Sequence, residues 1–261
     1  MKINTSRIRE TKRNLGVRLE KYRELKKQRG MTLLEIIIVL GIIGTIAAGV
    51  VILAQRAFDA KAMTDLTNNI NTVRTAMKDA YGNTGIYPVP AGAAVVALND
   101  QSITEAAGQA TPIGKLIALG KVSRDESKNN VSNDFFNVGA ANLSTNGVQK
   151  GYFLEINGLN QQQCRNILLQ AGNSFDYVQT TNAAPAGTYS VDTAPVDISV
   201  ALQGVTPAVA GTGGNPGTPA LLSGSGIFRS LAANGNTLIT ADGVIGACTN
   251  DSNNSVILGS R

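Results

Sequence analysis

The sequence predicts a mixed chain in which one long N-terminal helix precedes several short helices and strands. Residues 36–54 are nineteen uncharged residues, and Thr45 carries their only hydroxyl group. No proline occurs before Pro88, so nothing forces a break in a helix over residues 31–82. Beyond Pro88, β-rich runs alternate with stretches rich in glycine, asparagine and proline.

The first half of the predicted helix needs apolar surroundings on every side. Residues 36–54 would span about 28 Å as a helix, close to the thickness of a bilayer's hydrocarbon core. Small residues interrupt this stretch and are common in membrane helices, where they also allow helices to approach closely. They are Gly41, Gly44, Ala47, Ala48 and Gly49.

The second half needs apolar surroundings on one side only. After Gln55, apolar residues recur at steps of three and four, which is the pattern of an amphipathic helix. They are Phe58, Ala62, Leu66, Ile70, Val73, Met77 and Tyr81. Gly82, Gly85 and Pro88 are expected to end the helix.

The charge is concentrated before the apolar stretch. Residues 1–30 hold 11 of the 23 Lys and Arg and 3 of the 18 Asp and Glu, so the sequence pI of 9.3 reflects this segment. A disordered basic tail or a nucleic-acid signal are alternative interpretations. The position of residues 1–30 next to an apolar span favours a third interpretation, that this segment is a cytoplasmic anchor. It is too long and charged for a secretory signal peptide.

Glu35 is unusual because it lies between Met31–Leu34 and the apolar run from Ile36 to Leu40. An ionised carboxylate there needs a cation, and residues 32–55 contain no Lys, Arg or His.

The segment Lys26-Lys-Gln-Arg-Gly30 followed by Met31-Thr-Leu-Leu-Glu35 resembles the processing site of type IV prepilins. The resemblance implies that a membrane prepilin peptidase cuts after Gly30 and methylates the amino group of Met31. Met31 as first mature residue and a leader of 30 residues are similar to the class-b pilins of enteric bacteria. Residues 119–129 are also similar to a segment of these pilins. The cleavage motif is shared by the pseudopilins of type II secretion.

Cleavage would create the cation that Glu35 lacks, the amino group of Met31. We therefore predict that Glu35 drives assembly by pairing with Met31 of a neighbouring subunit, with Thr32 adding a hydroxyl donor. An intrachain pair is the alternative, since the two groups are four residues apart.

The resemblance implies an α+β type IV pilin fold, with the long helix packed on an antiparallel sheet. The expected parts are a cleaved leader (1–30), a transmembrane and assembly helix (31–54), an amphipathic half (55–82) and a globular head (83–261). Loops beside the sheet would form the exterior of a filament.

Cys164 and Cys248 are the only cysteines. An exported chain with two widely spaced cysteines most simply forms one disulfide, closing residues 164–248, and free buried thiols are the alternative. Closing such a loop stabilises by about 4–5 kcal/mol in the chain-entropy model.

The remaining elements are predicted from short patterns. Helices are expected near Ile113–Leu119, Gln161–Ala171 and Ile227–Ala233, strands at Gly151–Ile156 and Phe175–Gln179, and β-rich segments at Thr237–Thr240 and Ser255–Leu258. Residues 83–150 are otherwise expected to be a long connection. Residues 182–226, rich in Ala, Gly, Pro, Thr and Ser, are expected to form ordered surface loops with short strands, with disorder as the alternative.

No pattern of an enzyme is found. The absence of histidine removes Ser/His/Asp catalysis and makes a zinc site improbable. Gly211–Gly217 lacks the lysine of a phosphate-binding loop. We therefore expect no catalytic residues, cofactor or metal, and no nucleic-acid partner.

The function predicted is that of the major subunit of a type IVb pilus. Its precursor would lie in the inner membrane with the assembly machinery, and its homopolymer would bind host cells or other bacteria. A minor pilin or secretion pseudopilin is the first alternative, and a single-span receptor or accessory protein the second.

Overall fold

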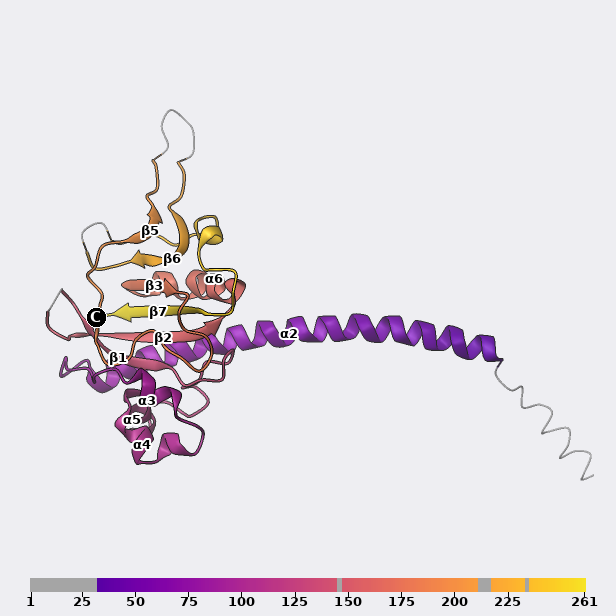
Figure 1. Ribbon diagram of the computed structural model, residues 1–261, viewed down its shortest axis with the longest axis horizontal. Coiled ribbons are helices and arrows are strands. Elements are labelled where there is room, and N and C mark those ends of the chain that lie inside the picture. The colour runs from indigo at the N-terminus through magenta and orange to yellow at the C-terminus, as the bar shows by residue number, and fades with distance from the viewer. Residues whose placement is uncertain (1–31, 145–146, 211–216, 233–234) are drawn as a thin grey trace, which may run out of the picture. The chain divides into compact units, whose positions relative to one another are not determined.

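The computed structural model describes residues 32–144, 147–210, 217–232 and 235–261 (Figure 1). The leader, with the cleavage site Gly30 and Met31, lies outside the described residues. The chain separates into two compact units, Met1–Ala57 and Phe58–Arg261. We call the second unit the head.

Helix α2, Leu33–Tyr81, belongs to both units and has 49 residues, confirming the predicted continuous helix. In the part of the chain that the structure describes, α2 is the one helix long and apolar enough to cross a membrane, with an 18-residue window of mean hydropathy 3.0. Beyond Tyr81, Gly85 has φ +60° and donates its N–H to the Tyr81 carbonyl oxygen at 2.9 Å. This left-handed conformation favours glycine and belongs to the turn of residues 82–85, which follows the end of the helix.

A seven-stranded sheet forms the centre of the head, in the order β4-β1-β2-β7-β3-β6-β5. The strands are β1 (Asn137–Asn142), β2 (Gly151–Leu159), β3 (Tyr177–Thr181), β4 (Val196–Asp197), β5 (Gln203–Thr206), β6 (Leu221–Arg229) and β7 (Asn254–Ser260). Neighbours are antiparallel except β1 and β4, which are parallel. Figure 1 shows the strands stacked from β1 to β5.

The two faces of the sheet are covered differently. On β2, Tyr152 and Leu154 join the large core cluster that contains Leu66 and Ile70 of α2, whereas Phe153 joins a smaller cluster with Ile198. This alternation follows the two-residue period of a strand. The amphipathic half of α2 therefore packs on one face, and residues around Ile198 cover the other.

Helices and turns complete the head. They are α3 (Gly92–Val96), α4 (Ala106–Ala110), α5 (Pro112–Ala118), α6 (Gln161–Gln170), and the 3₁₀ turns η1 (Ser102–Thr104), η2 (Gly172–Ser174) and η3 (Gly243–Gly246). Residues 119–129 are attached to α2 by Asn69, whose amide donates to the carbonyl oxygens of Asp125 (3.2 Å) and Lys128 (3.1 Å). Lys121 pairs with Asp79 of α2 at 2.5 Å.

Residues 182–202, which we call the strap, connect three distant positions in the sheet. The strap leaves β3, reaches β4 beside β1, and returns to β5 at the opposite edge. On the return, Ile198 donates its N–H to Asn142 and accepts one from Leu231. The expectation of ordered loops with short strands is therefore confirmed for the described part of residues 182–226.

Three predictions of local structure were wrong. Residues 83–150 contain α3, α4 and β1 in addition to the expected α5. The described residues of Ile227–Ala233 form no helix. The first of them belong to β6, where Ile227 and Phe228 lie on opposite faces of the sheet. Thr237–Thr240 forms no strand. Its backbone is held by a side chain instead of a neighbouring strand: Ile239 N–H donates to Asn173 Oδ1 (3.0 Å), and Asn173 Nδ2 donates to the Ile239 carbonyl (2.8 Å).

Candidate assembly and stabilising sites

The start of α2 carries the two described residues of the predicted assembly site. Thr32 precedes the helix, and its Oγ1 accepts the N–H of Glu35 at 3.3 Å. The Thr32 carbonyl accepts the N–H of Ile36 at 3.2 Å. No described residue donates a hydrogen bond to the carboxylate of Glu35, and none forms an ion pair with it.

Among the described residues of the first unit, the apolar half of α2 has no partners outside its own helix. Every leucine, isoleucine and valine from Leu33 to Leu53 is exposed, and no neighbouring atom lies within 4 Å of the Cβ position of Gly41, Gly44 or Gly49. The single hydroxyl group, that of Thr45, donates to the Ile42 carbonyl at 2.9 Å. This surface would need lipid or another protein to cover it.

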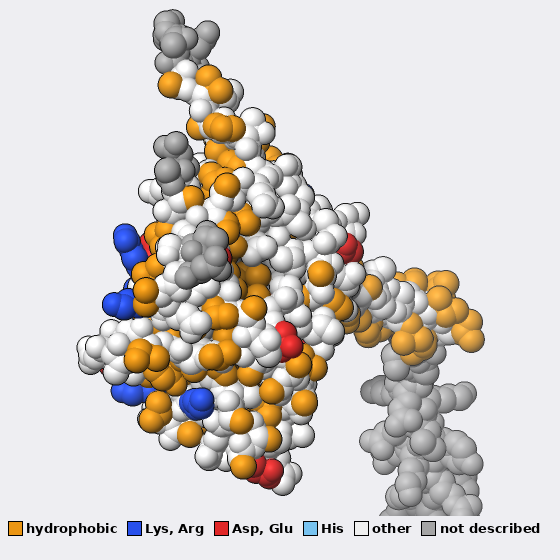
Figure 2. All heavy atoms as spheres, turned by 60° about the vertical axis from the view of Figure 1, so that its left-hand side comes forward, with side chains coloured by type: hydrophobic (Ala, Val, Ile, Leu, Met, Phe, Trp, Pro, Cys, Tyr) orange, Lys and Arg blue, Asp and Glu red, His pale blue; other side chains and the backbone are white. Residues whose placement is uncertain are grey.

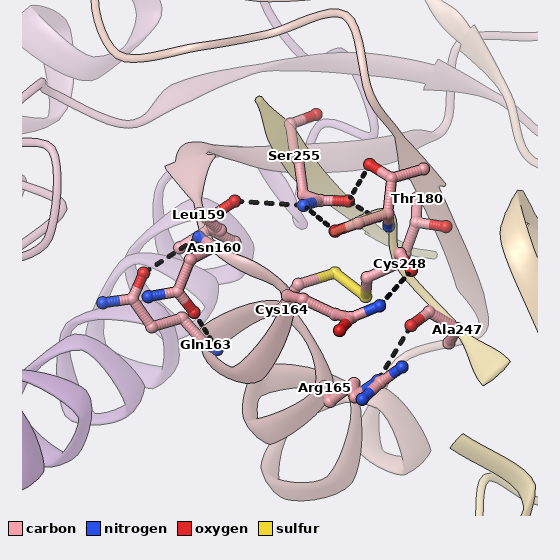
Figure 3. The surroundings of a disulfide bond; sticks show 12 residues. Leu159, Asn160, Gln163, Cys164, Arg165, Thr180, Ala247, Cys248 and Ser255 are labelled. Atoms are coloured by element: carbon pink, nitrogen blue, oxygen red, sulfur yellow. Dashed lines mark hydrogen bonds between the residues drawn. A yellow bond between two sulfur atoms is a disulfide. The ribbon is translucent and has the colours of Figure 1, made fainter. Parts of the chain in front are cut away.

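Cys164 of α6 and Cys248 form a disulfide, with a Cα–Cα distance of 6.3 Å, so the expected bridge is present (Figure 3). Helix α6 begins with a capping box, in which Asn160 and Gln163 satisfy each other's backbone N–H groups. The N-cap Asn160 thereby fixes the helix start at Gln161, three residues before Cys164.

Two side chains of α6 hold the backbone on the other side of the bridge. Arg165 Nε donates to the Ala247 carbonyl at 3.0 Å, and Gln161 Nε2 donates to the Cys248 carbonyl at 3.1 Å (Figure 3). Cys248 has φ +66°, a conformation uncommon for a residue with a side chain. Its own N–H reaches the Gly224 carbonyl at 2.9 Å. The bridge is thus part of a wider hydrogen-bonded junction between α6, β6 and the C-terminal loop.

Sequence reasoning missed Glu155, a fully buried carboxylate on β2. It accepts five hydrogen bonds: from Ser190 N (2.7 Å) and Oγ (2.5 Å), Val191 N (3.1 Å), Asn137 Nδ2 (3.1 Å) and Ser255 Oγ (3.1 Å). None of the ion pairs among the described residues involves Glu155. Hydrogen-bond donors from the strap, β1 and β7 therefore take the place of a cation.

A second carboxylate, Asp134, holds the same strap. It accepts hydrogen bonds from Gly187 N and Asn157 Nδ2, both at 2.7 Å. Nearby, Tyr189 donates its hydroxyl to the Phe135 carbonyl. Burial, and then the charges of Asp134 and Glu155, raise the pKa of Tyr189 well above its usual range. No sequence pattern indicated these contacts, because their partners are distant in the chain.

Strands β5 and β6, with the described residues between them, form an extended arm (203–210 and 217–229), which we call the β5–β6 arm. The head also has an apolar cavity of about 750 Å³ at the base of this arm. Its lining includes Leu202, Val205, Ala208, Pro219 and Leu238. Residues 198–228 contain no charged side chain, and the arm in Figure 2 accordingly has neither blue nor red atoms. Among the described residues, no group of three or more His, Cys, Asp or Glu could hold a metal ion.

Comparisons with known proteins agree with the features of α2 and the head. The family model described as "Prokaryotic N-terminal methylation motif" matches residues 25–51. The chain is 37% identical over 157 residues to the toxin coregulated pilin of Vibrio cholerae serotype O1, and 38% identical over 153 residues to a second Vibrio cholerae toxin coregulated pilin. The crystal structure of TcpA, a type IV pilin from the El Tor biotype of Vibrio cholerae, matches with a TM-score of 0.53 at 22% identity, covering 77% of this chain and 99% of that one.

These matches support a type IV pilin of class b, and the solved structure supports the fold. The chain's alignments with the two toxin coregulated pilins cover 60% and 58% of this chain and 64% and 61% of theirs, which is less than two thirds of those relatives. The α+β pilin fold expected from the sequence is confirmed, with a mostly antiparallel sheet. These relatives are structural proteins. The roles of Gly30, Met31, Thr32 and Glu35 in this pilin stay predictions.

Proposed function

We propose that this pilin is the major structural subunit of a type IVb pilus, a surface filament for adhesion, bacterial aggregation and host colonisation. The observation that carries the proposal is the exposed apolar surface of α2 from Leu33 to Leu53, which contains one carboxylate, Glu35, and no cation. A polymer in which these helices pack together would bury that surface and leave the folded head outside.

The precursor is proposed to lie in the inner membrane before assembly. Residues 1–30 would remain in the cytoplasm because of their positive charge, and the residues after Ala54 would lie on the other side. Prepilin peptidase would then cut between Gly30 and Met31 and methylate Met31. The inner-membrane assembly machinery would add the processed subunit to the filament.

Pairing of Glu35 with a neighbour's Met31 would drive subunit addition. In a low-dielectric environment the carboxylate must find a cation or become protonated. The new amino group of Met31 is positively charged near neutral pH and is the only cation that processing supplies near Glu35. An intermolecular pair relieves one buried charge for each added subunit, and it also fixes the axial stagger between neighbours.

Glu35→Gln tests the pairing because it keeps the size of the side chain and removes the charge. Removing one partner of a buried pair typically costs about 3–5 kcal/mol, a factor of roughly 10²–10⁴ in an equilibrium. We expect the variant to be cut at Gly30 and to stay in the inner membrane without forming filaments. Glu35→Asp, one methylene shorter, should assemble poorly.

Filaments sheared from the cells measure assembly, and a mass spectrum of the same chains reports cleavage and methylation. Wild-type amounts of filament from Glu35→Gln would contradict the proposal. Abundance in the sheared material also separates a major pilin from a minor pilin or a pseudopilin, which would be scarce there. A single-span receptor or accessory protein would be absent from it.

The uncharged β5–β6 arm supports a role in contacts between filaments. Val209, Leu221 and Leu238 are 64%, 49% and 65% exposed around the apolar cavity, and no charge on residues 198–228 would repel an identical surface. Ala208→Asp introduces a charge at the cavity, and it should reduce bundling and adherence at unchanged filament number. Ala107→Asp, on the exposed side of α4, is the matched control. Equal bundling in both variants would leave the arm without this role.

A further inference from the structure

The head contains two methionines, Met63 and Met77, and they differ in what surrounds them. Both lie on the buried face of α2 and belong to the large core cluster. Met77 has no exposed surface, whereas Met63 is 8% exposed and lines a partly open pocket of about 340 Å³ between α2 and α6. One thioether is therefore enclosed by the core, and the other lies between the core and a pocket.

The lining of this pocket is rich in amide side chains. Gln163 and Gln170 of α6 use their Oε1 atoms as acceptors, for the Asn160 N–H at 3.0 Å and the Thr67 hydroxyl at 2.7 Å. No hydrogen bond among the described residues uses the Nε2 groups of these two glutamines, and none uses the side chain of Asn166 in the same lining. The pocket therefore has amide donors that the head itself does not use.

A thioether that a peroxide can reach is oxidised to a sulfoxide. The sulfur attacks one peroxide oxygen, and an S–O bond forms as the O–O bond breaks. The other oxygen takes the proton of the transferred oxygen and leaves as water, so the sulfur loses two electrons and the peroxide gains them. The new oxygen is a hydrogen-bond acceptor, which disrupts a sealed apolar core but is stabilised beside free amide donors.

We propose that Met63 is an oxidation site for peroxides, and that the amide-lined pocket accommodates its sulfoxide while Met77 stays reduced. The pocket admits the oxidant to the sulfur, and Asn166 and Gln170 supply donors to the oxygen that the reaction adds. The head then stays folded after it has consumed the oxidant. This inference does not depend on how the chain assembles.

Reaction with hydrogen peroxide tests access to the sulfur. The full chain is purified in detergent and treated with peroxide, and mass spectrometry follows the gain of one oxygen atom in the peptides that contain Met63 and Met77. We expect Met63 to react at least about tenfold faster than Met77, because susceptibility follows exposure. In urea above the unfolding transition the two should react at equal rates. Met63→Leu keeps a similar volume and should remove the fast site.

Urea unfolding before and after oxidation tests the accommodation of the sulfoxide. The midpoint of the wild-type head should fall little on oxidation. Asn166→Leu/Gln170→Leu removes two donors from the pocket, so its midpoint should fall more on oxidation than that of the wild type. Gln101→Leu is the control, because Gln101 is exposed and outside the lining of this pocket, and its fall should equal that of the wild type.

Equal oxidation of Met63 and Met77 in the folded chain, or protection of both, would overturn access through the pocket. A fall of the midpoint in the oxidised wild type as large as in the oxidised Asn166→Leu/Gln170→Leu variant would overturn accommodation by the amides. Both results are independent of filament amount, so they are distinguishable from failure of the assembly proposed for Glu35.

Discussion

Glu35 and Glu155 occur in the same tripeptide, Leu-Glu-Ile, and have opposite surroundings. Glu155 is fully buried and accepts five hydrogen bonds from three parts of the head. Glu35 is exposed on α2, and no described residue donates to its carboxylate. One carboxylate is compensated inside its own subunit. The described residues give the other no such compensation, and the assembly role proposed for Glu35 rests on this difference.

The difference arises from secondary structure. Glu155 is on a strand, where Asn137 lies directly opposite on β1 and the strap covers the same face. Glu35 is on a helix, where the residues three and four positions away are the only close neighbours. Towards the C-terminus these are Ile38 and Val39, which have no polar side chain. Local sequence alone therefore does not reveal whether a buried or lipid-facing carboxylate is satisfied.

Opening the disulfide should have the largest effect on the head and none on the span around Glu35. Cys164→Ser opens a loop with a sequence separation of 84, which the chain-entropy model values at about 4–5 kcal/mol. We expect a large drop in the urea midpoint of the mature chain in detergent, and loss of filaments. Glu35→Gln is the control, since it should leave the midpoint unchanged. Wild-type midpoints for Cys164→Ser would show that the bridge does not stabilise the head.

Glu155→Gln should have the next largest effect. The amide keeps one acceptor oxygen but turns an NH₂ group towards donors of the strap, β1 or β7. Each buried donor left without a partner costs about 1–3 kcal/mol. Urea unfolding should report that loss, and hydrogen exchange should increase first at residues 184–198.

Glu105→Gln is the matched control for Glu155→Gln, because Glu105 is exposed and makes no side-chain cap bond. Equal stability of the two variants would mean that the five hydrogen bonds add nothing. The comparison with Glu35 would then lose its basis.

Lys61→Ala should have the smallest effect and tests whether charge pairing matters everywhere on α2. Lys61 pairs with Asp65 at 2.5 Å, but their side chains are 72% and 37% exposed. Helix pairs of this spacing contribute about 0.5 kcal/mol or less in water. We expect unchanged urea midpoints and filament amounts. A loss of filaments as large as in Glu35→Gln would show that the apolar environment is not what makes Glu35 special.

The parts of the fold that the sequence predicted are those with strong local signals. The apolar and amphipathic periods of α2, the short apolar pattern of Gln161–Ala171, and the β-rich run Ser255–Leu258 all point to the observed structure. The disulfide needed only a count of cysteines and an exported chain. The Glu35 assignment came from one charge in a long uncharged run together with the family resemblance.

The missed parts depend on contacts between distant residues. Strand β1, Asn-Val-Gly-Ala-Ala-Asn, has little β propensity and is ordered by pairing with β2. Strand β6 contains Ser-Gly-Ser-Gly, and its end was mistaken for a helix because Ile227 and Phe228 are adjacent apolar residues. The buried role of Glu155 was not predicted, because its hydrogen-bond donors Ser190, Val191 and Ser255 are far away in sequence.

The place of β7 has a consequence for how the pilin is made. β7 is the last strand in the chain, yet it lies between β2 and β3 in the middle of the sheet. In the proposed topology, β2 and β3 would have no common partner until Asn254–Ser260 had crossed the membrane, and Cys248 would have become available to Cys164 only shortly before. Without β7 the sheet would be divided between β2 and β3, so the head would close only when this strand is in place.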